Sequence, residues 1–275
     1  MIKRLIINAD DFGFSRSVTD GIIHAHSHGI LTSTTLMTTM PDCDRAMDIA
    51  RSHPQLGVGI HLCLTQGTPR SGPLQYLASA NNQFPRHVGQ LLRRIHLNRK
   101  ALDEVRAEWA AQIEYALNYA LRPTHLDSHK HIHHWPALAN VAVNLAGQYQ
   151  IPCLRCADEI SVVGTPALAP GYRGLRFLAR RLKRRLGGVQ LRSTDWFYGL
   201  GATGKFSSER WLLFLDHLPP GTGEVMVHPG YSTDLDAQST RLTTQRQLEL
   251  EGLCAPVVIE KMDALKVQRA HFGQL

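Results

Sequence analysis

The stretch His125-Leu-Asp-Ser-His-Lys-His-Ile-His-His134 decides how the rest of this sequence is interpreted. It holds five of the fifteen histidines, and polar groups occupy every second position: His125, Asp127, His129, His131 and His133. Because side chains alternate between the two faces of an extended strand, we expect these five groups on one face. Imidazole nitrogen and carboxylate oxygen suit zinc, and less selectively nickel, iron or cobalt. The pattern therefore favours a metal site over a solvated, histidine-rich edge strand.

The segments around this stretch predict a parallel α/β sheet. The apolar run Leu5 to Ile7 leads into Asp10-Asp11, and two further strands, 30–37 and 56–62, follow with a helix between each pair. Alternation of strands and helices is typical of parallel α/β folds. The later part of the chain continues the pattern, with helices at 102–121, 136–148 and 245–253, strands at 151–156, 193–198 and 224–227, and a last helix or strand–helix pair at 257–265.

Length and composition are those of an ordinary globular protein. A chain of 275 residues can bury a full-sized core, and 43% hydrophobic with 19% charged residues is ordinary for such proteins. The net charge of +7 favours anionic partners without deciding the fold. Five cysteines argue against a disulfide framework. The amino terminus is too short and too soon polar for a signal peptide, and no apolar run approaches ~18–20 residues, so we expect a soluble cytoplasmic enzyme.

Polar clusters end four of the predicted strands: Asp10-Asp11, His61, the histidine stretch and His228. The carboxyl ends of parallel strands share one face, so we expect these groups to converge there. One carboxylate and two histidines would leave an open metal position for water. Alone, Asp10-Asp11 would indicate a turn or helix cap, and His61 a core residue. Since adjacent aspartates cannot point the same way from one strand, we expect one on the metal and the other beside it as a base.

Several further residues are candidates for supporting roles. The imidazole of His228 could act as a general acid near neutral pH. Asp127 could orient a ligand histidine or be a ligand itself. The remaining candidates for contacting a substrate or orienting a ligand are His131, His133, Arg155 and Tyr231.

Four motifs, in this order, resemble those of the YdjC-like family: Asn8-Ala-Asp-Asp-Phe-Gly13, Gly59-Ile-His-Leu62 with Leu64-Thr65, Thr124 to His133, and His228-Pro-Gly230. The resemblance implies a distorted (β/α) barrel related to polysaccharide deacetylases. It also implies metal-dependent removal of an N-acetyl group from an amino sugar, in an oligosaccharide or glycolipid. Carried over by motif, Asp11, His61 and His129 would bind one divalent ion, Mg or Zn, while Asp10 would be the base and His228 the acid.

The resemblance implies that the chain is one deacetylase domain. Residues of about 159–222 match no motif, and we expect them to form an insertion or outer helical region. A metal-dependent isomerase or aldolase acting on a sugar remains an alternative. An enolate mechanism would need a lysine base, and strand alternation turns Lys130 away from the cluster. Nucleic-acid binding is disfavoured, because no recognisable nucleic-acid-binding motif accompanies the arginines of 173–192.

The segment 173–192 itself predicts a basic amphipathic helix. Such a helix could contact an anionic membrane surface, or its apolar side could dock on the barrel while its arginines face solvent. We favour docking on the barrel. A homodimer is also left open.

Overall fold

A parallel sheet forms the centre of the computed structural model, which describes residues 3–79, 81–162, 169–235, 238 and 240–275. Six strands follow the spatial order β4-β3-β2-β1-β6-β5, all neighbours are parallel, and β7 pairs with the start of β1. The strands are β1 (Lys3–Phe12), β2 (Ser33–Leu36), β3 (Gly57–Leu62), β4 (Leu126–Ser128), β5 (Trp196–Tyr198), β6 (Gly221–Val227) and β7 (Gln268–Ala270). The predicted α/β fold in a single domain is confirmed.

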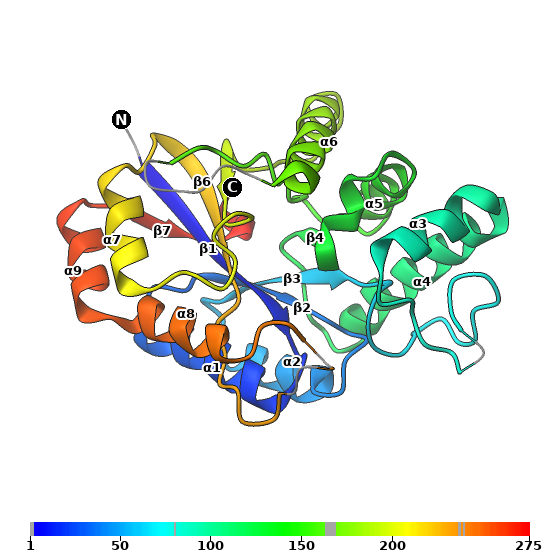
Figure 1. The fold of residues 1–275 in the computed structure, drawn as a ribbon, viewed down its shortest axis with the longest axis horizontal. Helices are drawn as coiled ribbons and strands as arrows, with labels where there is room; N and C mark the ends of the chain where they lie inside the picture. Colours follow the sequence, from blue (N-terminus) through cyan, green and yellow to red (C-terminus); the bar gives the residue numbers. More distant parts are fainter. Residues whose placement is uncertain (1–2, 80, 163–168, 236–237, 239) are drawn as a thin grey trace.

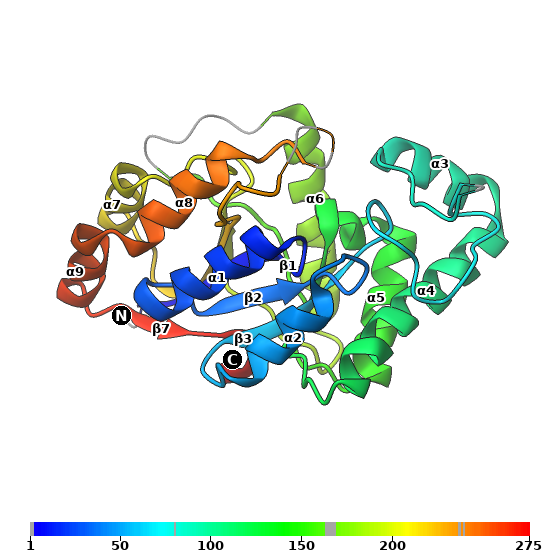
Figure 2. The ribbon, with the colours of Figure 1, turned by 90° about the horizontal axis from the view of Figure 1, so that it is seen from below.

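Helices surround this sheet (Figures 1 and 2). α1 and α2 lie side by side along the sheet, α3 to α5 gather at one side, and α7 to α9 gather at the other. The helices are α1 (Arg16–His28), α2 (Cys43–Arg51), α3 (Val88–Leu97), α4 (Arg99–Asn118), α5 (Pro136–Gln148), α6 (Pro170–Leu186), α7 (Ser208–Asp216), α8 (Thr244–Cys254) and α9 (Pro256–Ala264), with 3₁₀ turns η1 (His129–His134) and η2 (Phe272–Gln274). Among the described residues, no helix combines the length and hydropathy that crossing a bilayer requires.

The predicted strand at 151–156 is wrong as a regular strand. This segment forms only single parallel bridges, from Leu154 to Leu126 and from Cys153 to Arg192, and Glu159 makes another to Phe197 in β5. The segment therefore spans the gap between the edge strands β4 and β5. It bends away from continuous pairing, so the barrel is distorted and only partly closed.

The expected long strand through the histidine stretch is also wrong. β4 ends at Ser128, and the next six residues form η1, in which Lys130 and His131 have left-handed backbones with φ of 56° each. The turn is stabilised by the Ser128 hydroxyl, which accepts from the His133 backbone N–H at 2.9 Å and contacts the His133 ring at 2.6 Å. The five alternating polar groups consequently do not share one face.

The basic segment does form the predicted amphipathic helix, α6. Its second half docks on the domain through three buried apolar residues, Ala179, Leu182 and Leu186. Arg176 and Arg180 pair with Asp158, at 3.3 and 2.9 Å. The first half is more open, and Tyr172 and Phe177 are exposed there. Residues 163–168 of the predicted insertion, which precede this helix, lie outside the described residues.

Candidate active site

A polar cleft of about 650 Å³ lies at the carboxyl ends of the strands. Its lining includes Asp10 and Asp11 from β1, His61 from β3, His129 after β4, and His228 after β6. The predicted convergence of these strand-end groups is therefore present. Basic side chains line the same cleft, namely those of Arg86, Lys130, Arg241 and Arg246.

Asp10 and Asp11 both face His61, contrary to the expectation that adjacent aspartates diverge. The pairing of β1 with β2 shifts register between Ala9 and Phe12, and Asp11 has a left-handed backbone with φ of 73°. This irregularity cancels the alternation of a regular strand. Asp11 Oδ1 lies 3.7 Å and Asp10 Oδ2 lies 4.0 Å from Nε2 of His61.

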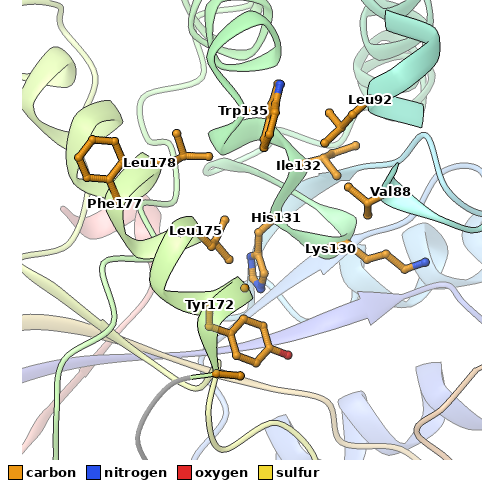
Figure 3. A pocket seen from close by; sticks show the side chains of 13 residues that line it. Val88, Leu92, Lys130, His131, Ile132, Trp135, Tyr172, Leu175, Phe177 and Leu178 are labelled. Carbon is orange, nitrogen blue, oxygen red and sulfur yellow. The ribbon is translucent and has the colours of Figure 1, made fainter. Parts of the chain in front are cut away.

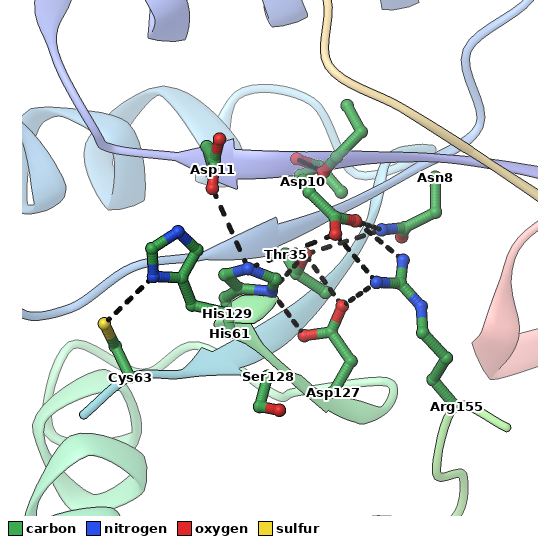
Figure 4. Close-up of polar contacts among 12 residues, drawn as sticks. Asn8, Asp10, Asp11, Thr35, His61, Cys63, Asp127, Ser128, His129 and Arg155 are labelled. Carbon is green, nitrogen blue, oxygen red and sulfur yellow. Dashed lines mark hydrogen bonds and ion pairs between the residues drawn. The ribbon is translucent and has the colours of Figure 1, made fainter. Parts of the chain in front are cut away.

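Asp127 fixes the orientation of His61 (Figure 4). Its Oδ1 lies 2.7 Å from His61 Nδ1, which leaves Nε2 directed toward Asp11 and Asp10. Burial opposes protonation of the ring, but the charges of Asp127, Asp10 and Asp11 outweigh it and raise the pKa of His61 to about 9. Without a bound cation, His61 is therefore an imidazolium surrounded by carboxylates.

His129 lies beside His61, with ring centroids 5.8 Å apart. Its Nδ1 is 2.7 Å from the Thr65 hydroxyl and 3.7 Å from Cys63 Sγ, so neither contact uses Nε2. Burial lowers the pKa of His129 to about 3, although the nearby Asp11 acts in the opposite direction. The neutral ring is the form that binds metals, and its second nitrogen is available for that role.

Arg155 joins the acidic groups of the site into one buried network (Figure 4). Its guanidinium binds Asp10 in a bidentate manner, at 2.8 and 2.7 Å, and also pairs with Asp127 and Glu224. The Asn8 side chain donates to Asp10 Oδ1 at 3.0 Å. Burial alone would raise the pKa of Asp10, but Arg155 and His61 hold it far below its usual range. Asp10 is thus ionised and fixed in orientation.

Two members of the site were missed from the sequence. Arg246 of α8 pairs with Asp11 Oδ2 at 2.6 Å, and nothing in its sequence surroundings indicates this role. Glu224 is fully buried in β6, and its carboxyl group accepts a hydrogen bond from the guanidinium of Arg155. A charged residue beside the apolar run Val225-Met-Val227 was a usable signal, because a buried carboxylate requires a partner.

The other candidates occupy different surroundings. His228 lines the cleft, and its buried Nδ1 has no hydrogen-bond partner among the described atoms. Burial lowers the pKa of His228, although Asp10 and Asp11 favour its charged form. Lys130 also lines the cleft, so the expectation that it points away is wrong; it fails because β4 ends before this residue.

The histidine stretch and Tyr231 divide between cleft and core. His131 lines the cleft, whereas His133 binds the backbone carbonyl of Arg155 at 3.0 Å. His125 stacks on Phe272, with ring centroids 3.8 Å apart. Tyr231 packs edge-on against His24 of α1, at 6.1 Å between centroids, and is not part of the cleft lining.

The donor groups could hold a metal ion. Ligand atoms of Asp10, His61 and Asp127, all buried, lie within 4.8 Å of one another. A cation among these three would also face the Arg155 guanidinium, which already pairs with both carboxylates. On the Nε2 side of His61, Asp11 Oδ1 lies 3.7 Å away, while the other oxygen of Asp11 pairs with Arg246. The His129 ring lies next to His61, with centroids 5.8 Å apart.

The chain is similar to known proteins over nearly its whole length. The chain is 34% identical over 269 residues to a carbohydrate deacetylase of Geobacillus stearothermophilus, covering 98% of this chain and 96% of that protein. A carbohydrate deacetylase of Halalkalibacterium halodurans is also 34% identical, with 91% and 94% coverage.

Solved structures show the same fold. A protein of Enterococcus faecalis V583, described as a candidate cellobiose-phosphate cleavage protein, superposes with a TM-score of 0.78 at 30% identity, covering 100% of this chain and 99% of that one. A mutant of the CE4 family pseudoenzyme BA3943 shares only the fold, with a TM-score of 0.50 at 9% identity, covering 100% of this chain and 67% of the other. The YdjC-like family model matches residues 4–264, and the chain belongs to this family.

Proposed function

We propose that this protein is a metal-dependent carbohydrate N-deacetylase, which hydrolyses the acetamide of an acetylated amino sugar to acetate and a free amine. The observation that carries the proposal is the convergence of Asp10, Asp11, His61, His129 and His228 in one cleft at the strand ends. Full-length relatives named carbohydrate deacetylases support the same reaction class.

Asp11, His61 and His129 are the proposed ligands of one divalent cation. Asp127 holds Nδ1 of His61 and Thr65 holds Nδ1 of His129, so both rings keep Nε2 for the ion, as ligand histidines do in metal sites. Two imidazoles and one carboxylate suit Zn better than Mg, which prefers oxygen ligands. When bound, such a cation acidifies water and polarises a carbonyl group.

Asp10 is the proposed general base. Arg155 fixes both of its carboxylate oxygens and keeps it ionised, so it accepts a proton from the attacking water in one defined orientation. The low pKa makes Asp10 a weak base in isolation, and its contribution therefore depends on a water that is already acidified.

His228 is the proposed general acid. The departing nitrogen must gain a proton as the C–N bond breaks, because an amide anion is a very poor leaving group. Burial lowers the pKa of His228, which makes its protonated form a stronger donor, while the ionised Asp10 and Asp11 help retain that proton until transfer.

The isomerase or aldolase alternative keeps one observation in its favour, since Lys130 lines the cleft. Its amine donates to the Arg86 carbonyl oxygen at 2.6 Å, a contact that a catalytic base would have to break. Acetate release from a panel of N-acetylated sugars, by chelated protein and after addition of Zn or Mg, separates the two reaction classes. Cation-dependent acetate release is expected, and its absence across the panel would refute the proposal.

A further inference from the structure

An apolar pocket of about 610 Å³ lies next to the polar cleft (Figure 3). Its walls come from α3, η1 and the first half of α6. Apolar side chains make up most of the lining, and the aliphatic ones among them include those of Val88, Leu92, Ile132, Leu175 and Leu178. None of the proposed chemistry uses this pocket.

The pocket directly adjoins the cleft. Five residues line both spaces: Val88, Lys130, His131, Tyr172 and Leu175. His131 and Leu175 adjoin each other where the two spaces meet (Figure 3). A molecule bound in the cleft would reach the pocket by passing these shared side chains.

The rim of the pocket exposes aromatic surface. Trp135 is 46% exposed, Tyr172 is 39% and Phe177 is 62%. Only seven large hydrophobic side chains are exposed among the described residues, so the gathering of three around one pocket is not a scatter of single residues. Concave apolar surface of this kind marks a place where a ligand excludes water.

The chemistry of the walls selects an apolar occupant. A sugar ring placed here would bury hydroxyl groups against aliphatic carbon, and an unpaired buried hydroxyl is costly. The polar side chains of the lining are Lys130, His131 and Tyr172, all at the boundary with the cleft, and the Lys130 amine already donates to the Arg86 carbonyl. An aliphatic group has no hydroxyl to leave unpaired, so its burial in the pocket carries no such cost.

We infer that the substrate is an amphiphile, in which the acetylated amino sugar occupies the cleft and an aliphatic group attached to it fills the pocket. This inference rests on the proposed deacetylase function. It assigns α3 and α6 as the elements that select the non-sugar part of the substrate.

Alkyl glycosides of N-acetylglucosamine with methyl, butyl and octyl groups, below their micelle concentrations, provide the test. With a bound methylene contributing up to about 0.8 kcal/mol, kcat/KM is expected to rise about two- to fourfold per methylene until the pocket is filled. Leu92→Asn and Leu178→Asn should flatten this dependence. The matched control is Leu97→Asn, because Leu97 is on α3 with Leu92 but is 70% exposed and outside the lining; it should keep the full dependence.

The outcomes separate this inference from the proposed function. Acetate release that is equal for all three glycosides would overturn the inference and leave the deacetylase proposal standing. If no glycoside releases acetate, the proposed function fails, and calorimetric binding of the octyl and methyl glycosides then decides about the pocket. Equal affinities, or a Leu97→Asn effect as large as that of Leu92→Asn, would overturn the inference.

Discussion

Replacing Glu224 with glutamine tests how the buried charges around Arg155 are balanced. One guanidinium faces three carboxyl groups, those of Asp10, Asp127 and Glu224, and His61 supplies a second positive charge next to the two aspartates. Glu224 is the least compensated of the three, since its buried Oε2 has no partner among the described atoms. Burial raises the pKa of Glu224 to about 7, although Arg155 opposes this shift.

The raised pKa sets the sign and size of the expected effect. The folded state holds a proton on Glu224 up to about pH 7, whereas the unfolded chain loses it near 4.5, so stability falls as pH rises between these values. A difference of about 2.5 pKa units at 1.36 kcal/mol per unit corresponds to about 3 kcal/mol. The glutamine variant has no such proton, and its free energy of unfolding should gain about 3 kcal/mol relative to wild type between pH 4.5 and pH 8.

Urea unfolding of the two metal-free proteins at pH 5, 6, 7 and 8 measures this difference. Glu251→Gln is the control, because it removes a charge from the exposed side of α8. A wild-type-to-variant difference that stays constant across the range would refute the reasoning, and would mean that Glu224 remains ionised against Arg155 throughout.

Three further predictions concern the cleft, and one concerns α6. His129→Ala should abolish stable metal binding while leaving the circular dichroism spectrum unchanged; full metal occupancy by mass spectrometry would remove His129 from the ligand set. Asp10→Asn should retain the metal and lose ~10²–10⁴-fold in kcat, as loss of a general base does, and loss of metal instead would exchange the roles of the two aspartates. Metal affinity should rise up to about tenfold per pH unit between pH 6 and 8, because a cation must displace the proton of His61, whose pKa is raised to about 9. Calorimetry in buffers of different ionisation enthalpy should detect the released proton. A metal affinity that is independent of pH would contradict the assignment of His61 as a ligand. Since the buried face of α6 is docked and two of its arginines are paired with Asp158, we expect no co-sedimentation with anionic liposomes at physiological salt, whereas salt-sensitive binding would revive the membrane contact.

The sequence predicted the place of the candidate site residues where they directly follow a strand that can be recognised from its apolar pattern. Asp10, His61 and His228 each come at the end of an apolar run, and strand polarity alone predicted that they meet. Periodicity failed in the histidine stretch, because two left-handed residues and the Ser128 hydroxyl end the strand there. An alternating polar pattern does not indicate such local backbone conformations.

The arginines of the site were harder to predict than its acids and histidines. Arg155 lies in an irregular segment that forms only isolated β-bridges. Arg246 lies in α8, whose sequence pattern is that of an ordinary surface helix. The aspartates of β1 with which they pair are more than 140 residues away in the chain, so only the closed fold reveals these pairings. For the same reason, β7 and α7 had no clear signal, since both are short and depend on packing against other elements.

The left-handed backbone of Asp11 restricts which residues can serve at that position. With φ of 73°, the position favours glycine, asparagine, aspartate and histidine, whereas β-branched and bulky side chains are strained there. Of these four, only aspartate carries a negative charge that can neutralise a cation. Glutamate is a metal ligand elsewhere, yet its longer side chain is less suited to this backbone than that of aspartate, which can hydrogen-bond locally. Backbone shape therefore restricts this position before ligand chemistry is considered, and Asp11→Asn removes the charge while keeping a side chain that suits this backbone.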